Sequence, residues 1–297
     1  MKLNENHIHR LSFSKFIFGE GEKHCNLTSP NNSIAILHMH DSVDIYIQLL
    51  CELYDKKPQK SNPALIDLIN SLNTKLQELD LDKINVPFFN RLNIARNRLK
   101  HESMFSTKID VLGIVNGIKD FYQHYTPIYF DGLDYNSISL IDLVVSAAVK
   151  KSLKTAKRLI DSSDFKNSLV EINKAFGYIL NDFTTIQTDN DYRERIVPSS
   201  WFRSISQSHR MQGDDLGIRG FRDFEEELKK SFDTLSELIV ITNLGIDFQD
   251  YARFEKYRLF GYMTTETEYT VIGDYRDNLT IDEINYCFDF VLQIALK

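Results

Sequence analysis

Glycine and proline are scarce in this chain, and that scarcity limits its possible folds more than any other feature. The 297 residues include only 12 glycines and 6 prolines, so tight turns and hairpins must be few. From Ser33 to about Lys57, apolar residues recur at the spacing of an amphipathic helix. With 42% hydrophobic residues, the chain can bury a core sufficient for one large or two medium domains. The sequence therefore predicts an all-α protein.

Cap and breaker residues divide the first half of the chain into four helices. Asn62-Pro63 is a cap followed by proline at the first helical position, and Val86-Pro87 begins another helix. Thr107, with Asp110 three residues later, resembles a capping box. Helices are expected over residues 33–57, 62–81, 86–104 and 107–125. Together they predict a helical bundle over residues 32–125.

The segments around this bundle are less regular. Residues 1–31 lack strong periodicity and are expected to be an N-terminal extension. Residues 126–136 are rich in turn formers and are expected to be a linker. Residues 137–297 are expected to form a second, mostly helical domain that begins with a helix to about Asp161. Within that domain we expect a long loop at 185–215 and, near its end, a short strand pair or a loop at 264–275.

Charge and cysteine content narrow the class of protein. A formal net charge of −7 gives no overall nucleic-acid signature, so any RNA contact must come from local clusters. Three widely spaced cysteines, Cys25, Cys51 and Cys287, fit a reducing compartment and predict no zinc site. No apolar run has the length of a signal peptide or a membrane span. The sequence predicts a soluble, cytoplasmic protein with no membrane contact.

One positively charged cluster stands out in the second half. Lys150, Lys151 and Lys154 are followed by two more basic residues, Lys157 and Arg158. Such a run is usually a solvated helix face, and the alternative is a surface that binds the RNA backbone. The sequence leaves both interpretations open.

The helix expected over residues 86–104 has two contrasting sets of side chains. At about 100° per residue, one stripe is apolar and the arc opposite it is polar. The stripe holds Phe88, Leu92, Ala95 and Leu99, and the arc holds Arg96, Asn97, Lys100 and His101. Arginine and histidine together are the minimum needed to cut RNA without a metal. Arg96 and Lys100 are four residues apart and carry like charges, which disfavours a helix and indicates a bound anion. A solvated basic face is the simpler interpretation.

The spacing of arginine and histidine has little specificity by itself. Chance supplies about one such pair in a chain of this kind, and a second pair, Arg203 and His209, lies in a polar stretch without an apolar stripe. We interpret the second pair as the chance match. His38, His40 and Asp41 come nearest to a metal-ligand set, but on a helix His40 points away from the other two. No metal site is predicted.

The segment RLNIARNRLKHESMF resembles the signature helix of the HEPN superfamily (higher eukaryotes and prokaryotes nucleotide-binding domain). Ribonucleases of that superfamily carry an arginine, a polar residue directly after it, and a histidine four to six residues later; here these are Arg96, Asn97 and His101. The segment SIAILHMHDSVDIYIQLLCELYD resembles the superfamily's first helix, with Asp44 as its acidic residue. The order of four helices also fits. Residues 137–297 are either a second, degenerate HEPN-like copy or a different helical domain.

The resemblance implies a metal-independent endoribonuclease of toxin or phage-defence type, without a cofactor. In that mechanism the 2′-hydroxyl of RNA attacks the adjacent phosphate, with His101 as general base or acid. Arg96 would stabilise the charge on the phosphorane, and Asn97 would orient His101 or the phosphate. Arg98 and Lys100 would add counter-charge along the strand. Superfamily nucleases pair two motif helices, which implies a homodimer with a composite site.

Two other functions remain possible on the sequence alone. A non-catalytic HEPN-type module would bind a nucleotide, a nucleic acid or a partner protein such as a nucleotidyltransferase antitoxin. An unrelated helical protein would carry the motif by chance. Loss of metal-independent cleavage on mutation of Arg96 and His101 separates the nuclease from both alternatives.

Overall fold

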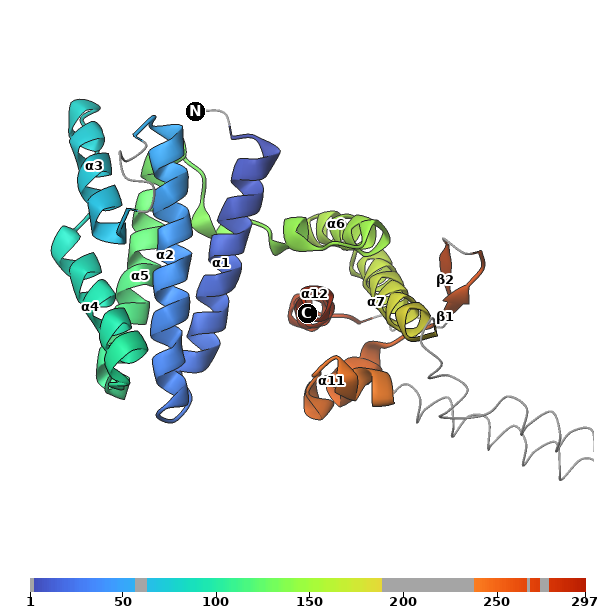
Figure 1. Ribbon diagram of the computed structural model, residues 1–297. Helices are drawn as coiled ribbons and strands as arrows, with labels where there is room; N and C mark the ends of the chain where they lie inside the picture. The colour runs from blue at the N-terminus through green and yellow to red at the C-terminus, as the bar shows by residue number, and fades with distance from the viewer. Residues whose placement is uncertain (1–2, 57–62, 189–237, 266–267, 273–277) are drawn as a thin grey trace, which may run out of the picture. The chain divides into compact units, whose positions relative to one another are not determined.

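The computed structural model describes residues 3–56, 63–188, 238–265, 268–272 and 278–297. These residues form two compact units, Met1–Leu143 and Val144–Lys297, each built mainly from helices (Figure 1). The all-α class is confirmed. No helix in the described ranges is both long and apolar enough to cross a membrane.

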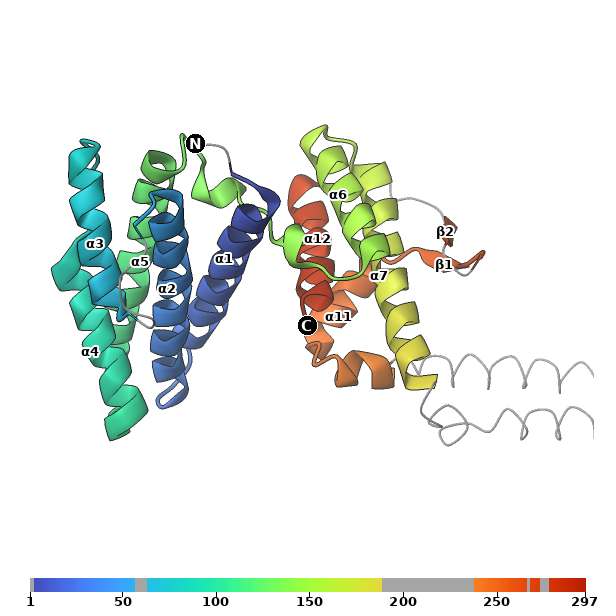
Figure 2. The same cartoon turned by 45° about the horizontal axis from the view of Figure 1, so that its top comes forward.

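The first unit is a helical bundle with α2 at its centre. In both views α1 covers one side of α2, and α3 and α4 cover the other (Figures 1 and 2). The helices are α1 (Glu5–Cys25), α2 (Ile34–Leu53), α3 (Leu65–Glu78), α4 (Val86–Glu102) and α5 (Lys108–Tyr129). The last four confirm the order expected from the caps, including Thr107, whose hydroxyl accepts a hydrogen bond from the Asp110 amide.

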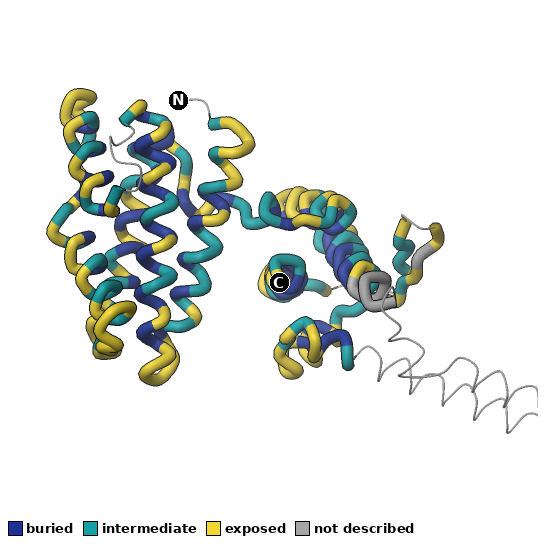
Figure 3. Tube along the Cα trace, viewed as in Figure 1, coloured by how far each residue is buried: buried dark blue, intermediate teal, exposed yellow. Residues whose placement is uncertain are grey.

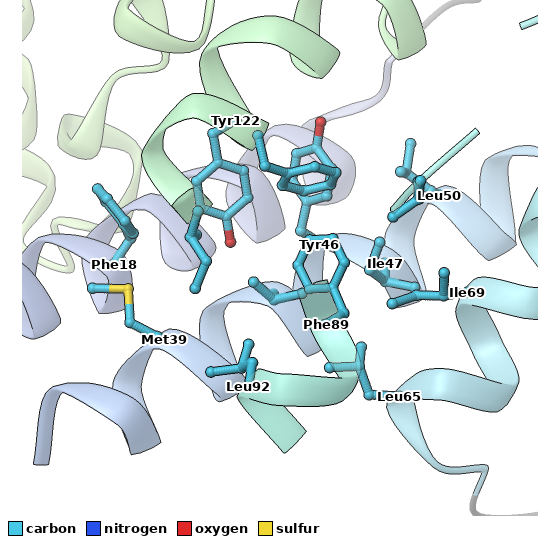
Figure 4. Close-up of a cluster of buried hydrophobic side chains, with 14 of the residues drawn as sticks. Phe18, Met39, Tyr46, Ile47, Leu50, Leu65, Ile69, Phe89, Leu92 and Tyr122 are labelled. Carbon is cyan, nitrogen blue, oxygen red and sulfur yellow. The ribbon is translucent and has the colours of Figure 1, made fainter. Parts of the chain in front are cut away.

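Apolar side chains from all five helices fill the bundle. Buried residues recur along the sides of the helices that face one another, whereas residues on the outer sides are exposed (Figure 3). Tyr46 of α2 is fully buried, and its ring meets the edges of Phe121 and Phe130. Figure 4 shows Phe89 and Leu92 of α4 in the same cluster. These two residues anchor the helix that carries Arg96.

The expected N-terminal extension is instead a helix of the bundle. α1 spans 21 residues and begins with a capping box between Asn4 and His7. Small polar residues make up much of its buried side: Ser12 and Ser14 are buried beside Leu11 and Phe18. Because hydroxyl groups take the place of apolar side chains there, the helix has no clear apolar stripe in its sequence. The prediction of an extension was wrong for this reason.

The expected linker at 126–136 also belongs to the first unit. α5 continues to Tyr129 with Pro127 inside its last turn. Tyr129 and Tyr135 are buried, and the Tyr135 ring stacks on Tyr122 at 4.8 Å between centroids. Aromatic packing thus outweighs the local preference of proline for ending a helix. The boundary between the units falls later, after Leu143.

The second unit has helices packed around a smaller aromatic core. The Phe176 ring lies 5.0 Å from Phe254, and Phe254 lies 4.7 Å from Phe290, centroid to centroid. In the described part of this unit the helices include α6 (Ala147–Asp161), α7 (Phe165–Thr188), α11 (Phe248–Phe254) and α12 (Ile281–Ala295). The Thr280–Glu283 capping box begins α12. An antiparallel pair, β1 (Phe260–Met263) and β2 (Tyr269–Ile272), lies close to the expected strand pair.

Two expectations for the second domain need correction. The helix expected from Ser137 begins only at Ala147, after short 3-10 helices at Tyr135–Ser137 and Leu140–Leu143. The expected loop at 185–215 overlaps α7, which continues through Thr188. The rest of that loop, with Arg203 and His209, lies outside the described residues.

Asn173 is a buried polar crosslink in the second unit. Its side chain is 3% exposed, donates to the Leu169 carbonyl at 2.9 Å and accepts from the Leu259 amide at 2.9 Å. Replacement by leucine leaves that amide buried without its partner, so Asn173→Leu should lower the free energy of unfolding of this unit by about 1–3 kcal/mol. Hydrogen exchange of the α7 amides at increasing urea concentration measures this change. The exposed Asn167 of α7 provides the control, since Asn167→Leu should cost less; equal costs would contradict the prediction.

Candidate active site

The motif helix α4 is fixed at both ends by local interactions. Asn85 precedes it, and its side chain accepts a hydrogen bond from the Phe88 amide at 3.3 Å. Pro87 lies in the first turn, where its missing amide hydrogen costs nothing. The helix ends at Ser103, whose φ of 54° is left-handed. These ends confirm a helix close to the expected 86–104.

The inner side of α4 differs from the predicted stripe by a small rotation. Leu92 is buried, and Phe88, Ala95 and Leu99 are partly buried against the core, as expected. Phe89, which the stripe left out, is only 1% exposed. Residues 89, 92 and 96 follow the i, i+3, i+7 spacing of one helix face. Arg96 therefore lies on the edge of the buried side and not opposite it.

The structure separates the four predicted polar residues of α4 into two pairs. Arg96 and Asn97 are half-buried, and an Nη atom of Arg96 donates to Oδ1 of Asn97 at 3.1 Å. Lys100 and His101, in contrast, are exposed in the last turn, as is Arg98. His101 lies five residues beyond Arg96, about 7.5 Å along the helix axis. Of the first pair, Arg96 lies near charged groups of α2.

Asp44 of α2 is the predicted acidic residue, and it lies close enough to Arg96 for their charges to interact. Burial raises the pKa of the Asp44 carboxyl group, and the nearby charges of His40 and Arg96 act in the opposite direction. Gln48 donates a hydrogen bond to its Oδ2 at 2.7 Å. The structure therefore brings together Arg96, Asn97 and Asp44.

His40 is a member of this site that the sequence interpretation missed. It lies one helical turn before Asp44 on α2 and is 9% exposed. Burial lowers the pKa of its imidazole, the positive charge of Arg96 lowers it further, and Asp44 and Asp41 oppose the shift. The i, i+4 spacing of His40 and Asp44 on the helix that faces α4 was the available signal. We call His40, Asp44, Arg96 and Asn97 the α2–α4 polar cluster.

The other histidines near α2 do not complete a metal site. His38 stacks on His24 of α1 at 5.2 Å between ring centroids. Burial and the charge of His24 lower the pKa of His38. In the described part of the chain, no three histidine, cysteine, aspartate or glutamate side chains are arranged to hold a metal ion. Cys25, Cys51 and Cys287 are all buried, and burial raises the pKa of the Cys51 thiol to about 11.

The predicted lysine cluster belongs to the second unit. Lys151 and Lys154 are exposed on α6 and Lys150 is half-buried, whereas Leu153 and Ala156 face the core. This arrangement is the amphipathic pattern expected of α6. It fits a solvated face and an RNA-binding face equally well, so both interpretations stay predictions.

Comparison with known proteins adds no relative: no family model, no curated protein and no solved structure matches the chain. The resemblance to HEPN proteins therefore stays a prediction from the residues. The α2–α4 polar cluster is defined by the contacts and charges of the structure alone.

Proposed function

We propose that this protein is a metal-independent endoribonuclease of the HEPN type, with α4 as its motif helix. The observation that supports this most is the α2–α4 polar cluster. It places a guanidinium, an amide, an imidazole and a carboxyl group together on two packed helices. Half-buried groups with shifted pKa values and a permanent cation are typical of proton-transfer sites.

Arg96 is the proposed phosphate-binding residue. Its guanidinium can donate two parallel hydrogen bonds to non-bridging phosphate oxygens, which a lysine cannot do. The bond to Asn97 restrains the guanidinium before RNA arrives. Asp44 is negatively charged when ionised and lies near Arg96, so it is placed to orient that side chain. The exposed Arg98 and Lys100 would bind neighbouring backbone phosphates.

His101 suggests that the site is completed by a second copy of the chain. It is exposed at the end of α4, outside the cluster. Large apolar side chains are exposed on the same helix and the segment after it: Ile94 at 43%, Met104 at 53% and Phe105 at 58%. Such exposure marks interaction surfaces. We propose a cytoplasmic homodimer through α4, of toxin or phage-defence type, whose RNA-cutting activity an antitoxin partner would restrain.

The exposure of His101 also favours the second candidate function. An exposed histidine outside the polar cluster is poorly arranged for catalysis within one chain. A non-catalytic module would use Arg96 and Asn97 to hold the phosphate of a nucleotide or nucleic acid. The two candidates share one binding site and differ only in whether RNA is cut.

Cleavage in the presence of excess EDTA distinguishes them. We expect purified protein to cut total tRNA or mRNA, and Arg96→Ala and His101→Ala each to reduce the rate at least about 100-fold. Arg91→Ala is the matched control, because Arg91 is exposed on the same helix and packs over the Phe88 ring. RNA binding without cleavage by the wild type would favour the binding module. Equal cleavage by all variants would contradict the nuclease proposal.

A further inference from the structure

His40 is the buried imidazole of the α2–α4 polar cluster, and the mechanism proposed above gives it no role. Its side chain is 11% exposed. The Nδ1 atom is fully buried and makes no hydrogen bond with any described residue. The small exposed part of the side chain therefore excludes Nδ1. Nε2 is the ring nitrogen left to reach a ligand.

Charged groups from two helices act on this imidazole. Asp41 and Asp44 do so from α2, and Arg96 does so from α4. The Oδ1 atom of Asp41 lies 3.6 Å from Nδ1, slightly longer than a hydrogen bond. A small rotation would let Nδ1 donate its proton to Asp41, which would leave the lone pair on Nε2. In the absence of RNA, burial and Arg96 favour the neutral ring, which is the form that accepts a proton.

We propose that His40 is the proton acceptor of the candidate site and that His101 is its proton donor. This assignment rests on the proposed ribonuclease function and gives separate roles to two histidines of the chain. The mechanism implied by the sequence motif has His101 as base or acid and gives no role to His40. The structure supplies the difference in environment, because one imidazole is buried next to Arg96 and the other is exposed.

The reaction is balanced without a metal or a cofactor. The 2′-oxygen forms a bond to phosphorus while its proton passes to Nε2 of His40. The bond from phosphorus to the 5′-oxygen breaks, and that oxygen takes a proton from protonated His101. Arg96 binds the non-bridging oxygens, where negative charge increases. The products are a 2′,3′-cyclic phosphate and a 5′-hydroxyl, and proton exchange with water restores both histidines.

The first test is the pH dependence of cleavage by His40→Gln. Glutamine keeps an amide near the position of the ring nitrogens but cannot accept the proton. Single-turnover cleavage in EDTA should fall at least about 100-fold. The wild-type rate should rise with pH on the acid side, because the base must lose its proton, and this rise should be absent in the variant. A purely structural role for His40 would lower the rate and leave the shape of the pH profile unchanged.

His38→Gln is the matched control for this variant. His38 lies on the same helix and is half-buried, and its ring stacks on His24 of α1. Its rate and pH profile should match those of the wild type. Circular dichroism and thermal melting establish that each variant is folded.

The second test changes the substrate and compares the two histidine variants. RNA with sulfur in place of the bridging 5′-oxygen has a leaving group that departs without a proton. Cleavage of this substrate should be nearly restored in His101→Ala, whereas His40→Gln should remain at least about 100-fold slower than the wild type. Restoration in His40→Gln alone would reverse the two roles and overturn the proposal.

Failure of the proposal and failure of the proposed function give different results. If the wild type cuts RNA and Arg96→Ala does not, but His40→Gln cuts at the wild-type rate, the role of His40 is wrong and the ribonuclease stands. If sulfur substitution does not restore His101→Ala, His101 is not the proton donor. If the wild type does not cut RNA at all, the proposed function is wrong and this assignment is wrong with it.

Discussion

Phe89→Ala is expected to lower the free energy of unfolding of the first unit by about 3–5 kcal/mol. Phe89 is 1% exposed, and the edge of its ring packs against Phe121 of α5 at 4.9 Å between centroids. Truncation removes these contacts and leaves a cavity that α2 and α5 cannot close without moving. Native-state hydrogen exchange of the α2 and α5 amides measures the loss directly, because these helices should open only with the whole unit.

The matched control is Phe105→Ala. Phe105 follows α4 and is 58% exposed, so the same truncation should cost less than about 1 kcal/mol. If the proposed function holds, Phe89→Ala should also reduce RNA cleavage, since Phe89 and Leu92 hold the helix that positions Arg96. Similar losses of stability for the two variants would show that Phe89 does not anchor α4.

The sequence predicted helices best where caps and apolar stripes agree. Thr107 and Thr280 both accept hydrogen bonds from the amides of residues three positions later, and each begins a helix of the structure. α4 begins at Val86 with Pro87 in its first turn, as expected, whereas α3 begins at Leu65 after an N-cap at Ala64, so Pro63 precedes the helix and is not its first residue. These signals are local, because each depends on residues within about one helical turn. The order of α2, α3, α4 and α5 was therefore predictable.

Elements stabilised by distant contacts were not predictable. α1 has few apolar residues on its buried side, because it approaches α2 closely through serines and Gly21. A Cβ atom at Gly21 would lie 3.1 Å from Cβ of His38. The last turn of α5 contains Pro127, which on its own favours an ending. In both cases tertiary packing decides the outcome, and its evidence is spread over distant parts of the chain.

The candidate site was predictable in part. Asp44 and Arg96 were selected from separate helices, and the structure brings their charges within interaction range. His40 was missed because the sequence interpretation compared it only with its neighbours His38 and Asp41. The relevant neighbour, Arg96, is 56 residues away in sequence and comes close through the packing of α2 on α4. A polar residue on a buried face gains its role from the opposite helix.

Ser14→Leu is the second substitution with a large expected effect, and it tests whether α1 belongs to the bundle. Ser14 of α1 and Ser42 of α2 form reciprocal hydrogen bonds. The Ser14 hydroxyl donates to the Ser42 carbonyl at 2.9 Å, and the Ser42 hydroxyl donates to the Ser14 carbonyl at 2.7 Å. The Tyr122 hydroxyl lies 2.7 Å from Oγ of Ser42. Three helices are therefore joined through one set of buried hydroxyl groups.

Leucine at position 14 disrupts this contact in two ways. It removes the hydrogen bond from the Ser14 hydroxyl to the Ser42 carbonyl, which keeps its helical partner within α2, so this loss costs about 0.5–1.5 kcal/mol. It also adds carbon atoms where Ser14 is only 1% exposed, and overpacking of this kind costs about 1–3 kcal/mol more. We therefore expect a loss of about 1.5–4.5 kcal/mol in the free energy of unfolding, measured by hydrogen exchange of α2.

Phe13→Leu supplies the comparison for Ser14→Leu. Phe13 precedes Ser14 in α1 and is 42% exposed, so leucine there should change the free energy of unfolding by less than about 1 kcal/mol. An N-terminal extension that only lies on the surface would tolerate both substitutions. If α2 keeps its protection from exchange in Ser14→Leu, α1 contributes little to the bundle. If protection falls across α2 and α5 together, α1 belongs to the same cooperative unit as these two helices. That unit includes α2, which packs against the motif helix α4.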